Sequence, residues 1–338
     1  MKQLIILTML WVSSASAVCP HFPADNIWNM RVDGLPVHPT SGQFVANIGA
    51  GTNAHPDFGH DPSNGIPLTI GAVSPNITVN FDDAGESDPS PYVIGTIESG
   101  SDAHSLYVNS TTCTLYEIDA TTLSGSPPIY GGFSGAIWNL NSNNFRLLAI
   151  STNGSVAGIT SADAAGLPIG VGLVRYDEVS AGSIDHALRF TAPQTHGSVW
   201  PGSHVTRGNV GIVYTDQPPL GSRFRLKASF DISSFSPTNQ VILQALKTYG
   251  MILADNGGPW YISGSPDARW NDSDLSGLGI KGVNFEMVDE SCAMVSTTSY
   301  QSNISNCNQA APLSASTPVT LNYQQALQAL KAAYGISP

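Results

Sequence analysis

The chain has little charge, and most of its charge is negative. Charged residues make up 11% of the sequence, against roughly 25% in an ordinary globular protein. Thirteen Lys and Arg against 25 Asp and Glu give a formal net charge of −12. Nucleic acids and anionic membrane surfaces bind to basic faces, so we expect neither as a partner.

Long apolar runs are also missing, apart from a short one at the N-terminus. The run from Leu4 to Val12 follows Lys2 and precedes Ala15-Ser16-Ala17, and it is too short to span a bilayer. A cationic start, a short apolar stretch and an A-x-A site are typical of a secretory signal peptide. We therefore expect residues 1–17 to be removed and the product to be secreted, extracellular or periplasmic.

The sequence holds only four cysteines and no C-x-x-C motif, which disfavours zinc ribbons and dithiol redox chemistry. An even number of cysteines in an exported chain favours two disulfides, with three connectivities open. Cys292 with Cys307 is the most economical pair, and Cys19 with Cys113 would then complete the set. In the chain-entropy model, closing the shorter loop stabilises the fold by up to about 3 kcal/mol.

No fixed-period repeat is present, which disfavours a propeller or a solenoid. Hydrophobic residues make up 41% of the chain, enough for a core, and short alternating runs separated by turn residues recur along it. We expect a mainly β, β-sandwich or jelly-roll-like single domain over residues 18–338, monomeric, with two or three peripheral helices. Residues 18–75, rich in Pro and Gly, are expected to wrap its surface as an N-terminal arm.

Helical signals are few. Ser236-Pro237 is a favourable helix start, and apolar spacing continues from it to Gly250. A second helix is expected over 322–334 and a short one over 161–166. Strands are expected at Ile77–Phe81, Tyr92–Ile97, His104–Val108, Cys113–Ile118, 136–140, Val171–Tyr176, His186–Phe190 and Phe224–Phe230. Met251–Ala254 and Trp260–Ile262 are expected to pair around the turn between them.

Common catalytic signatures are absent. The chain has no G-x-S-x-G, no H-E-x-x-H and no phosphate-binding glycine loop, which disfavours ordinary serine hydrolases and zincins. The chemistry must therefore be sought in clusters of polar residues rather than in a motif.

The densest polar cluster runs from Asp163 through Arg175-Tyr176-Asp177-Glu178 to His186 and Arg189. If residues 171–176 continue as a strand, alternation places Tyr176 and Glu178 on one face. A carboxylate, a histidine and an arginine brought together could perform acid–base chemistry on a sugar. The alternative is a hairpin with a surface charge pair and a core histidine.

A second cluster combines acids with aromatic rings. Asp255 is followed by Trp260, and Asp267 and Trp270 come soon after. Glycosidases set two carboxyl groups across the scissile bond, and indole rings can stack on sugars. The candidate carboxyl groups are Asp163, Glu178, Asp255 and Asp267. The alternative is that the acids form turns and the tryptophans fill the core.

Metal signals are weak. The segment His55–Asp61 offers imidazole and carboxylate groups, but its Pro and Gly favour a surface loop. Asn271-Asp272-Ser273-Asp274 could hold a structural calcium ion, although capping of a short helix is the simpler account. His104, in an apolar run, is expected to be a core histidine. We expect no catalytic metal and no cofactor other than that calcium.

Four segments carry a family resemblance: Ala24–Asn29, Ser161–Pro168, Gly172–Glu178 and Lys227–Trp260. Together they resemble a group of secreted bacterial proteins that are sometimes joined to carbohydrate-binding modules. The resemblance covers nearly the whole mature chain. It implies export, a single domain and a glycan substrate, and it assigns no catalytic residue.

These observations favour a secreted carbohydrate-active enzyme, a glycoside hydrolase or polysaccharide lyase, that acts on a polysaccharide or oligosaccharide. Its expected acid–base or nucleophilic groups are Asp163, Glu178, His186 and Asp255. Its expected substrate-binding residues are Arg175, Tyr176, Arg189, Trp138, Trp200, Trp260, Asp267 and Trp270. The alternative is a non-catalytic glycan-binding or cell-surface module, in which the tryptophans matter and the carboxylates do not.

Overall fold

The computed structural model describes residues 19–146, 149–150, 156–157, 160–204, 216–296 and 299–309. The expected signal peptide and the helix expected over 322–334 lie outside these residues. The described strands are β1 (His55–Asp57), β2 (Leu68–Gly71), β3 (Val79–Phe81), β4 (Ser105–Asn109), β5 (Thr114–Ile118), β6 (Thr122–Ser124), β7 (Ile129–Gly132), β8 (Gly135–Asn139), β9 (Ala149–Ile150), β10 (Val156–Ala157), β11 (Leu188–Ala192), β12 (Arg223–Leu226), β13 (Met251–Asn256), β14 (Tyr261–Ser263) and β15 (Phe285–Met287).

Helices are fewer than strands. The α-helices are α1 (Ser41–Ile48), α2 (Tyr176–Ala181), α3 (Pro237–Thr248) and α4 (Asp272–Leu275). Single turns of 3₁₀ helix lie at Ile27–Asn29, Ser276–Leu278, Gly282–Asn284 and Ser291–Ala293, with a longer one at Ile304–Gln309. Within the described residues the protein is therefore mainly β, as expected from the sequence.

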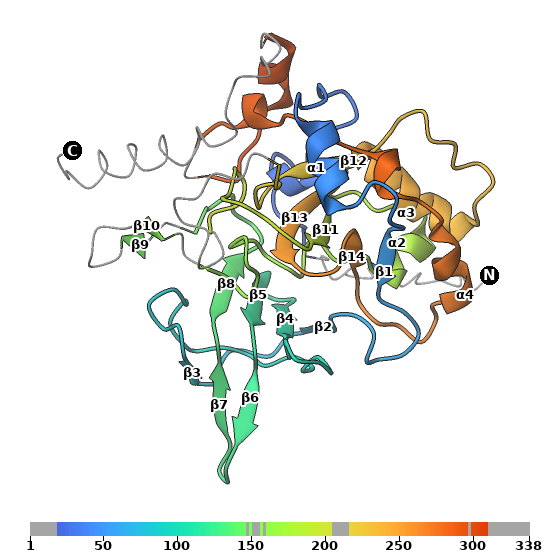
Figure 1. Cartoon of the computed structure of the whole chain (residues 1–338). Coiled ribbons are helices and arrows are strands. Elements are labelled where there is room, and N and C mark those ends of the chain that lie inside the picture. Colours follow the sequence, from blue (N-terminus) through green and yellow to red (C-terminus); the bar gives the residue numbers. More distant parts are fainter. Residues whose placement is uncertain are drawn as a thin grey trace, which may run out of the picture.

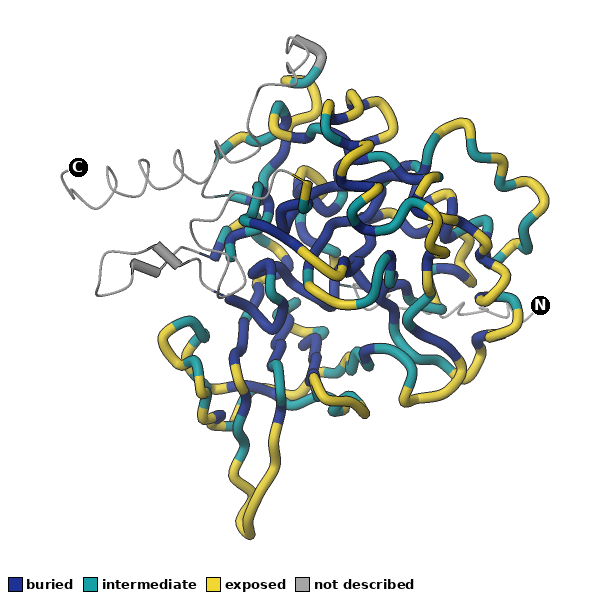
Figure 2. The backbone as a smooth tube through the Cα atoms, viewed as in Figure 1, coloured by how far each residue is buried: buried dark blue, intermediate teal, exposed yellow. Residues whose placement is uncertain are grey.

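The largest sheet has six strands in the order β1-β14-β11-β13-β12-β15. It is mixed: β1 is parallel to β14 and β11 is parallel to β13, whereas the other neighbours are antiparallel. A four-stranded sheet follows the order β2-β4-β5-β8, and a three-stranded one the order β3-β7-β6. The β6–β7 hairpin projects from the body, and its tip is exposed (Figures 1 and 2).

Helix α3 forms where the sequence predicts it. The Ser236 hydroxyl accepts a hydrogen bond from the Asn239 backbone N–H, and Pro237 is the first helical residue. Gly250 follows the helix with φ of +66°, a conformation that glycine adopts without strain. The helix buries Ile242 and Leu246 and packs against β12.

The expected N-terminal arm is instead part of the core. Within residues 19–75, the side chains of Ile27, Trp28, Phe44 and Phe58 are buried in the main hydrophobic cluster, and this region also supplies the edge strands β1 and β2. Its Pro and Gly residues shape turns between buried positions, so frequent turn formers here do not indicate a surface segment.

Four other local predictions were wrong. Residues 92–97 form no strand beyond single bridges at Tyr92 and Ile97. Residues 171–175 form no strand beyond a single bridge from Val174 to Gly264, and α2 starts at Tyr176. Residues 161–166 form a turn, in which the Ser161 hydroxyl accepts from the Asp163 N–H. β13 and β14 do not pair with each other, because β11 lies between them.

Both expected disulfides are present. Cys19 bonds to Cys113 with Cα atoms 5.2 Å apart, and Cys292 bonds to Cys307 with Cα atoms 4.9 Å apart. All four cysteines of the chain are therefore paired, which fits an oxidising compartment. Within the part of the chain described, no helix is both long and apolar enough to cross a membrane.

Candidate functional site

The centre of the six-stranded sheet contains a buried ion pair. Arg189, on β11, donates from Nε to Asp163 Oδ2 at 2.9 Å and from Nη2 to Asp163 Oδ1 at 2.8 Å. Its Nη1 donates to the Ser263 hydroxyl on the neighbouring strand β14 at 2.6 Å. The two parallel hydrogen bonds fix the orientation of both charged groups, so the pair is a rigid support for whatever lies beside it.

Asp255 lies beside this pair and reaches solvent. It sits near the end of β13, and its Oδ2 is 3.4 Å from Arg189 Nη2. Its side chain is 28% exposed, whereas that of Asp163 is fully buried. Burial, together with the negative charge of Asp163, raises the pKa of Asp255 to about 7. This carboxyl group is therefore protonated in a large fraction of molecules near neutral pH.

Three more acidic residues interact electrostatically with Arg189 or Asp163. Asp57 lies at the end of β1, Glu98 precedes β4 and Asp119 follows β5. Burial opposes ionisation of Glu98, but the hydrogen bonds and charge of His104 outweigh it and lower the pKa of Glu98, and Arg189 adds to this. His55 and then Arg189 act in the same direction on the pKa of Asp57. For Asp57 and Asp119, burial is the largest effect, so the pKa of each lies above its ordinary value.

His104 connects this acidic region to the four-stranded sheet. Its Nδ1 lies 2.5 Å from Glu98 Oε2 and its Nε2 lies 3.8 Å from Asp119 Oδ1. Burial favours the neutral ring, but the hydrogen bond and charge of Glu98 outweigh it and raise the pKa of His104. We call Asp57, Glu98, His104, Asp119, Asp163, Arg189 and Asp255 the Arg189 cluster.

Glu117 is a further buried acid, on β5. Its Oε1 accepts from the backbone N–H groups of Ile169 and Gly170 at 2.9 and 2.8 Å, and its Oε2 accepts from Trp138 Nε1 at 2.8 Å. Burial raises its pKa to about 7. With three protein donors on its oxygens and no exposure, Glu117 joins three segments of the core rather than facing a substrate.

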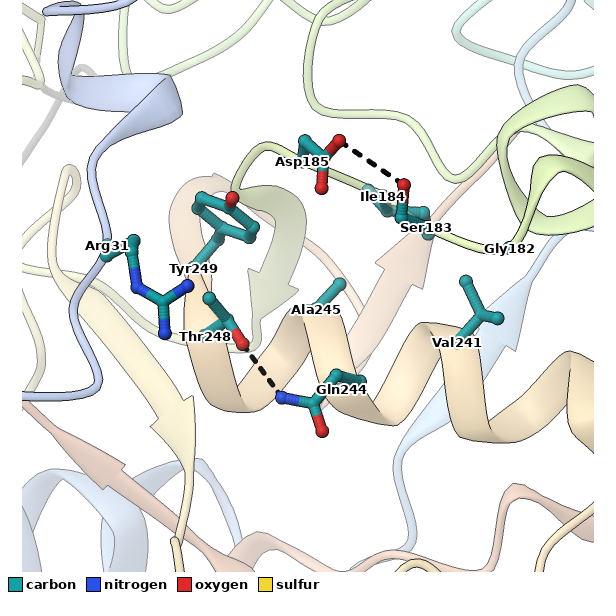
Figure 3. Close-up of a pocket in the computed structure, with 10 residues that line it drawn as sticks. All are labelled: Arg31, Gly182, Ser183, Ile184, Asp185, Val241, Gln244, Ala245, Thr248 and Tyr249. Atoms are coloured by element: carbon teal, nitrogen blue, oxygen red, sulfur yellow. Dashed lines mark hydrogen bonds between the residues drawn. The ribbon is translucent and has the colours of Figure 1, made fainter.

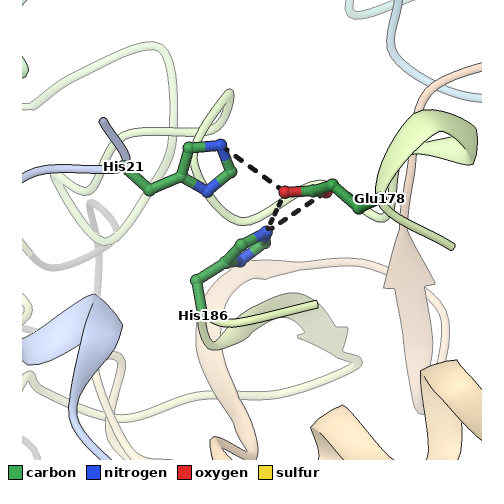
Figure 4. A group of neighbouring side chains, drawn as sticks. All are labelled: His21, Glu178 and His186. Atoms are coloured by element: carbon green, nitrogen blue, oxygen red, sulfur yellow. Dashed lines mark hydrogen bonds and ion pairs between the residues drawn. The ribbon is translucent and has the colours of Figure 1, made fainter. Parts of the chain in front are cut away.

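A second polar cluster joins the N-terminal segment to helix α2, as Figure 4 shows. Glu178 Oε1 lies 3.2 Å from His186 Nε2 and 3.6 Å from His21 Nε2. Arg175 donates from Nη2 to the same oxygen at 2.7 Å and from Nε to Oε2 at 3.1 Å, and its Nη2 also contacts His21 Nε2. We call these four residues the His21 cluster.

Charges inside the His21 cluster favour an ionised carboxylate and a neutral His21. Burial by itself would raise the pKa of Glu178, but His186 and Arg175 lower it well below its usual range. Burial lowers the pKa of His21, and the charges of His186 and Arg175 add to this. A carboxylate and a neutral imidazole thus lie together at the start of α2.

The helical conformation at residues 176–181 separates Tyr176 from Glu178. Residues two apart lie on opposite sides of a helix, whereas on a strand they share a face. The Tyr176 ring packs edge-on to Trp270 with centroids 4.9 Å apart, and the Arg269 guanidinium lies over it. Arg269 also binds both carboxylate oxygens of Asp267. Tyr176 and Asp267 belong to this contact network and not to the Arg189 cluster.

The four tryptophans expected to stack on sugars are buried. Trp138, Trp200, Trp260 and Trp270 are at most 6% exposed. Each indole N–H donates to a protein acceptor: Glu117, or the carbonyl of Ser299, Gly49 or Ser265. The expectation that these rings stack on a sugar at the surface is therefore wrong. The indole rings pack in the core, where burial of their large apolar area stabilises the fold.

The two segments considered for metals have protein partners. Asn271 caps α4 by accepting from Ser273 and Asp274 N–H, while Asp272 and Asp274 accept from His60 N–H and the Ser236 hydroxyl. His55 and Asp57 belong to β1 rather than to a loop. His55 packs on Tyr261, with ring centroids 4.3 Å apart.

A cavity of about 260 Å³ lies beside α3 (Figure 3). Its lining includes Arg31, Gln244 and Tyr249, and Asp185 is its one carboxylate. The Ser183 hydroxyl donates to Asp185 at 3.3 Å. Without a second carboxyl group, this cavity does not meet the requirement for acid–base cleavage of a glycosidic bond.

The structure places six of the expected site residues in the two clusters. Asp163, Arg189 and Asp255 come together in one, and Arg175, Glu178 and His186 in the other. Sequence analysis missed His21, Asp57, Glu98, His104 and Asp119 as members of these clusters. Glu98 and His104 are close in the chain, but no local spacing connects these residues to Arg189 or Glu178.

The chain was compared with protein-family models, with curated proteins and with solved structures, and none matches.

Proposed function

We propose that the protein is a secreted glycoside hydrolase in which Asp255 is the general acid. The observation that carries the proposal is the position of Asp255: partly exposed, next to the buried Asp163–Arg189 pair, with a pKa raised to about 7. A carboxyl group that stays protonated near neutral pH can donate its proton to a leaving glycosidic oxygen.

A glycosidase also needs a second carboxyl group across the scissile bond. Asp57 and Asp119 are the candidates, with side chains 48% and 28% exposed. Both belong to the Arg189 cluster, whereas Asp163 is fully buried by its pairing with Arg189. In this proposal Asp163 and Arg189 position Asp255, and Asp57 or Asp119 activates water or attacks the sugar.

Two observations favour hydrolysis over the alternatives. A lyase acting on uronates needs a group that neutralises the substrate carboxylate, but Arg175 and Arg189 already bind Glu178 and Asp163. A binding module of the kind expected would present its tryptophans, yet the four candidates are buried. Exposed carboxyl groups, rather than exposed indoles, distinguish this surface.

Export and architecture are part of the same proposal. The paired cysteines support a secreted product. One hydrophobic cluster contains Leu115 and Trp138 from the four-stranded sheet together with Phe190 and Leu253 from the six-stranded sheet. This shared core supports a single, sandwich-like domain.

The test is a polysaccharide panel incubated with mature protein, with reducing ends and absorbance at 235 nm measured in parallel. New reducing ends without absorbance indicate hydrolysis, and we expect Asp255→Asn to lower the rate at least about 100-fold. Asp57→Asn and Asp119→Asn identify the second carboxyl group. Asp33→Asn, at an exposed acid paired with Arg31, is the matched control and should leave the rate unchanged.

Three results would count against the proposal. Unchanged activity in Asp255→Asn removes the assigned acid. Absorbance at 235 nm that accompanies the new reducing ends means a lyase. Binding to one polymer without any release of sugar means the non-catalytic module.

A further inference from the structure

The His21 cluster contains the donor set of a transition-metal site. One ring nitrogen of His21, one ring nitrogen of His186 and a Glu178 carboxylate oxygen all lie within 4.8 Å of one another. They come from three separate places in the chain (Figure 4): His21 from the N-terminal segment, Glu178 from helix α2, and His186 from the segment just before β11. Two imidazoles and one carboxylate are a common ligand set of catalytic Zn²⁺ sites and of non-haem Fe²⁺ sites.

The spacing of these atoms matches the edges of a coordination tetrahedron. With metal–ligand bonds of about 2.0–2.1 Å, ligand atoms in a tetrahedral site lie about 3.4 Å apart. The two edges that meet at Glu178 Oε1 measure 3.2 Å to His186 and 3.6 Å to His21. These two edges are therefore close to the spacing that a tetrahedral zinc ion requires.

The hydrogen bonds of His186 turn its Nε2 atom toward the other ligand atoms. His186 Nδ1 lies 2.8 Å from the carbonyl oxygen of Ala187. A carbonyl only accepts, so Nδ1 donates to it, and Nε2 is the nitrogen left for a metal, which would replace the contact between Nε2 and Glu178 Oε1. A backbone carbonyl on the outer nitrogen is the usual support of a metal-binding histidine.

Arg175 brings a positive charge to the three ligand residues. Its Nη2 contacts Glu178 Oε1 and His21 Nε2 together, so the guanidinium interacts with two of the three ligand atoms. Its Nε–Oε2 hydrogen bond uses the other carboxylate oxygen. Rotation of the terminal guanidinium would free Oε1 for a metal, and the Nε contact could still orient the carboxylate.

We propose that His21, Glu178 and His186 bind one divalent transition-metal ion, with Zn²⁺ preferred, and that Arg175 is displaced from Glu178 Oε1 when the ion binds. The site lies outside the Arg189 cluster and is independent of the proposed hydrolase activity. Zn²⁺ prefers this mixture of nitrogen and oxygen ligands in tetrahedral geometry, and three protein ligands leave a fourth position open.

The test is a Zn²⁺ titration of mature protein previously treated with EDTA and dialysed, using a chromophoric chelator as competitor. We expect one equivalent to bind to the unaltered protein. His21→Ala and Glu178→Gln should each weaken binding by more than about 100-fold. His60→Ala removes an exposed histidine that lies outside the cluster, and it should bind as the unaltered protein does.

Arg175→Gln separates a metal site from an ion-pair network. If Arg175 competes with the metal, this variant should bind Zn²⁺ more tightly than the unaltered protein. Circular dichroism spectra and melting curves without metal show whether each variant is folded. The proposal is overturned if the unaltered protein binds no stoichiometric Zn²⁺, or if folded His21→Ala binds as tightly as His60→Ala.

Discussion

Arg189 binds both carboxylate oxygens of Asp163 through two parallel hydrogen bonds of 2.8 and 2.9 Å, and the two side chains are 4% and 0% exposed. Breaking a buried pair by removing one partner leaves an uncompensated charge and costs about 3–5 kcal/mol. We therefore expect Arg189→Met to lower the free energy of unfolding by that amount, as measured by chemical denaturation.

The matched control for this variant is Arg31→Met. Arg31 pairs with Asp33 at the surface, and its side chain is 62% exposed, so its loss should cost at most about 1 kcal/mol. Equal losses in the two variants would show that the buried Arg189–Asp163 pair stabilises the fold no more than a surface ion pair does.

Asp255 should make stability depend on pH. Its pKa is about 7 in the folded chain, against an ordinary value of 3.8, so between these values the folded state binds more protons than the unfolded state. Its contribution to stability is present below pH about 4 and is lost as the pH rises through 7. Denaturation curves from pH 4 to 8 should show a smaller decline in Asp255→Asn, and an unchanged decline would contradict the assignment.

Glu117 accepts three hydrogen bonds without contact with solvent. Glu117→Gln replaces one acceptor oxygen with an NH₂ group that faces an N–H donor. We expect a loss of about 1–3 kcal/mol in the free energy of unfolding, visible as a lower melting temperature.

A double-mutant cycle with Trp138→Phe tests whether the loss comes from these contacts. Because Trp138 donates directly to Glu117, the two losses should be non-additive by about 0.5–3 kcal/mol. Additive losses would mean that Glu117 acts through some other contact.

The two disulfides should differ in their effect. The bond between Cys292 and Cys307 spans 15 residues and that between Cys19 and Cys113 spans 94. In the chain-entropy model their removal costs about 3 and nearly 5 kcal/mol, so Cys19→Ser/Cys113→Ser should unfold at lower denaturant than Cys292→Ser/Cys307→Ser. The reverse order would exclude loop length as the main determinant.

Local signals in the sequence predicted helix α3, strands β4 and β5 and both disulfides. Each depends on neighbouring residues or on the small number of cysteines: Ser236 and Pro237 start the helix, and Asn109 accepts from Thr111 and Thr112 in the hairpin turn. The prediction of a strand ending at Tyr176 was wrong, although Asp177 and Glu178 in the first turn and Gly182 at the end are helix signals.

The sites were harder to predict than the elements. Arg189 was assigned to the same polar cluster as Asp163, and the two side chains do pair. Asp255 was assigned to a second cluster, yet it lies beside this buried pair. His21 lies 157 residues before Glu178 (178 minus 21), and only tertiary packing brings them together. For the tryptophans, closeness in sequence was misleading. Although they lie near acidic residues in the chain, they are buried in the core, where a large ring is most stabilising.

The Cys19–Cys113 bond makes the His21 cluster dependent on oxidation. Cys19 is two residues before His21, so the bond to the turn between β4 and β5 holds the histidine close to its partners in advance. Where thiols stay reduced, the N-terminal segment lacks this covalent link. Bringing His21 to Glu178 then costs more conformational entropy. Completion of the cluster is thereby favoured by oxidation of this cysteine pair.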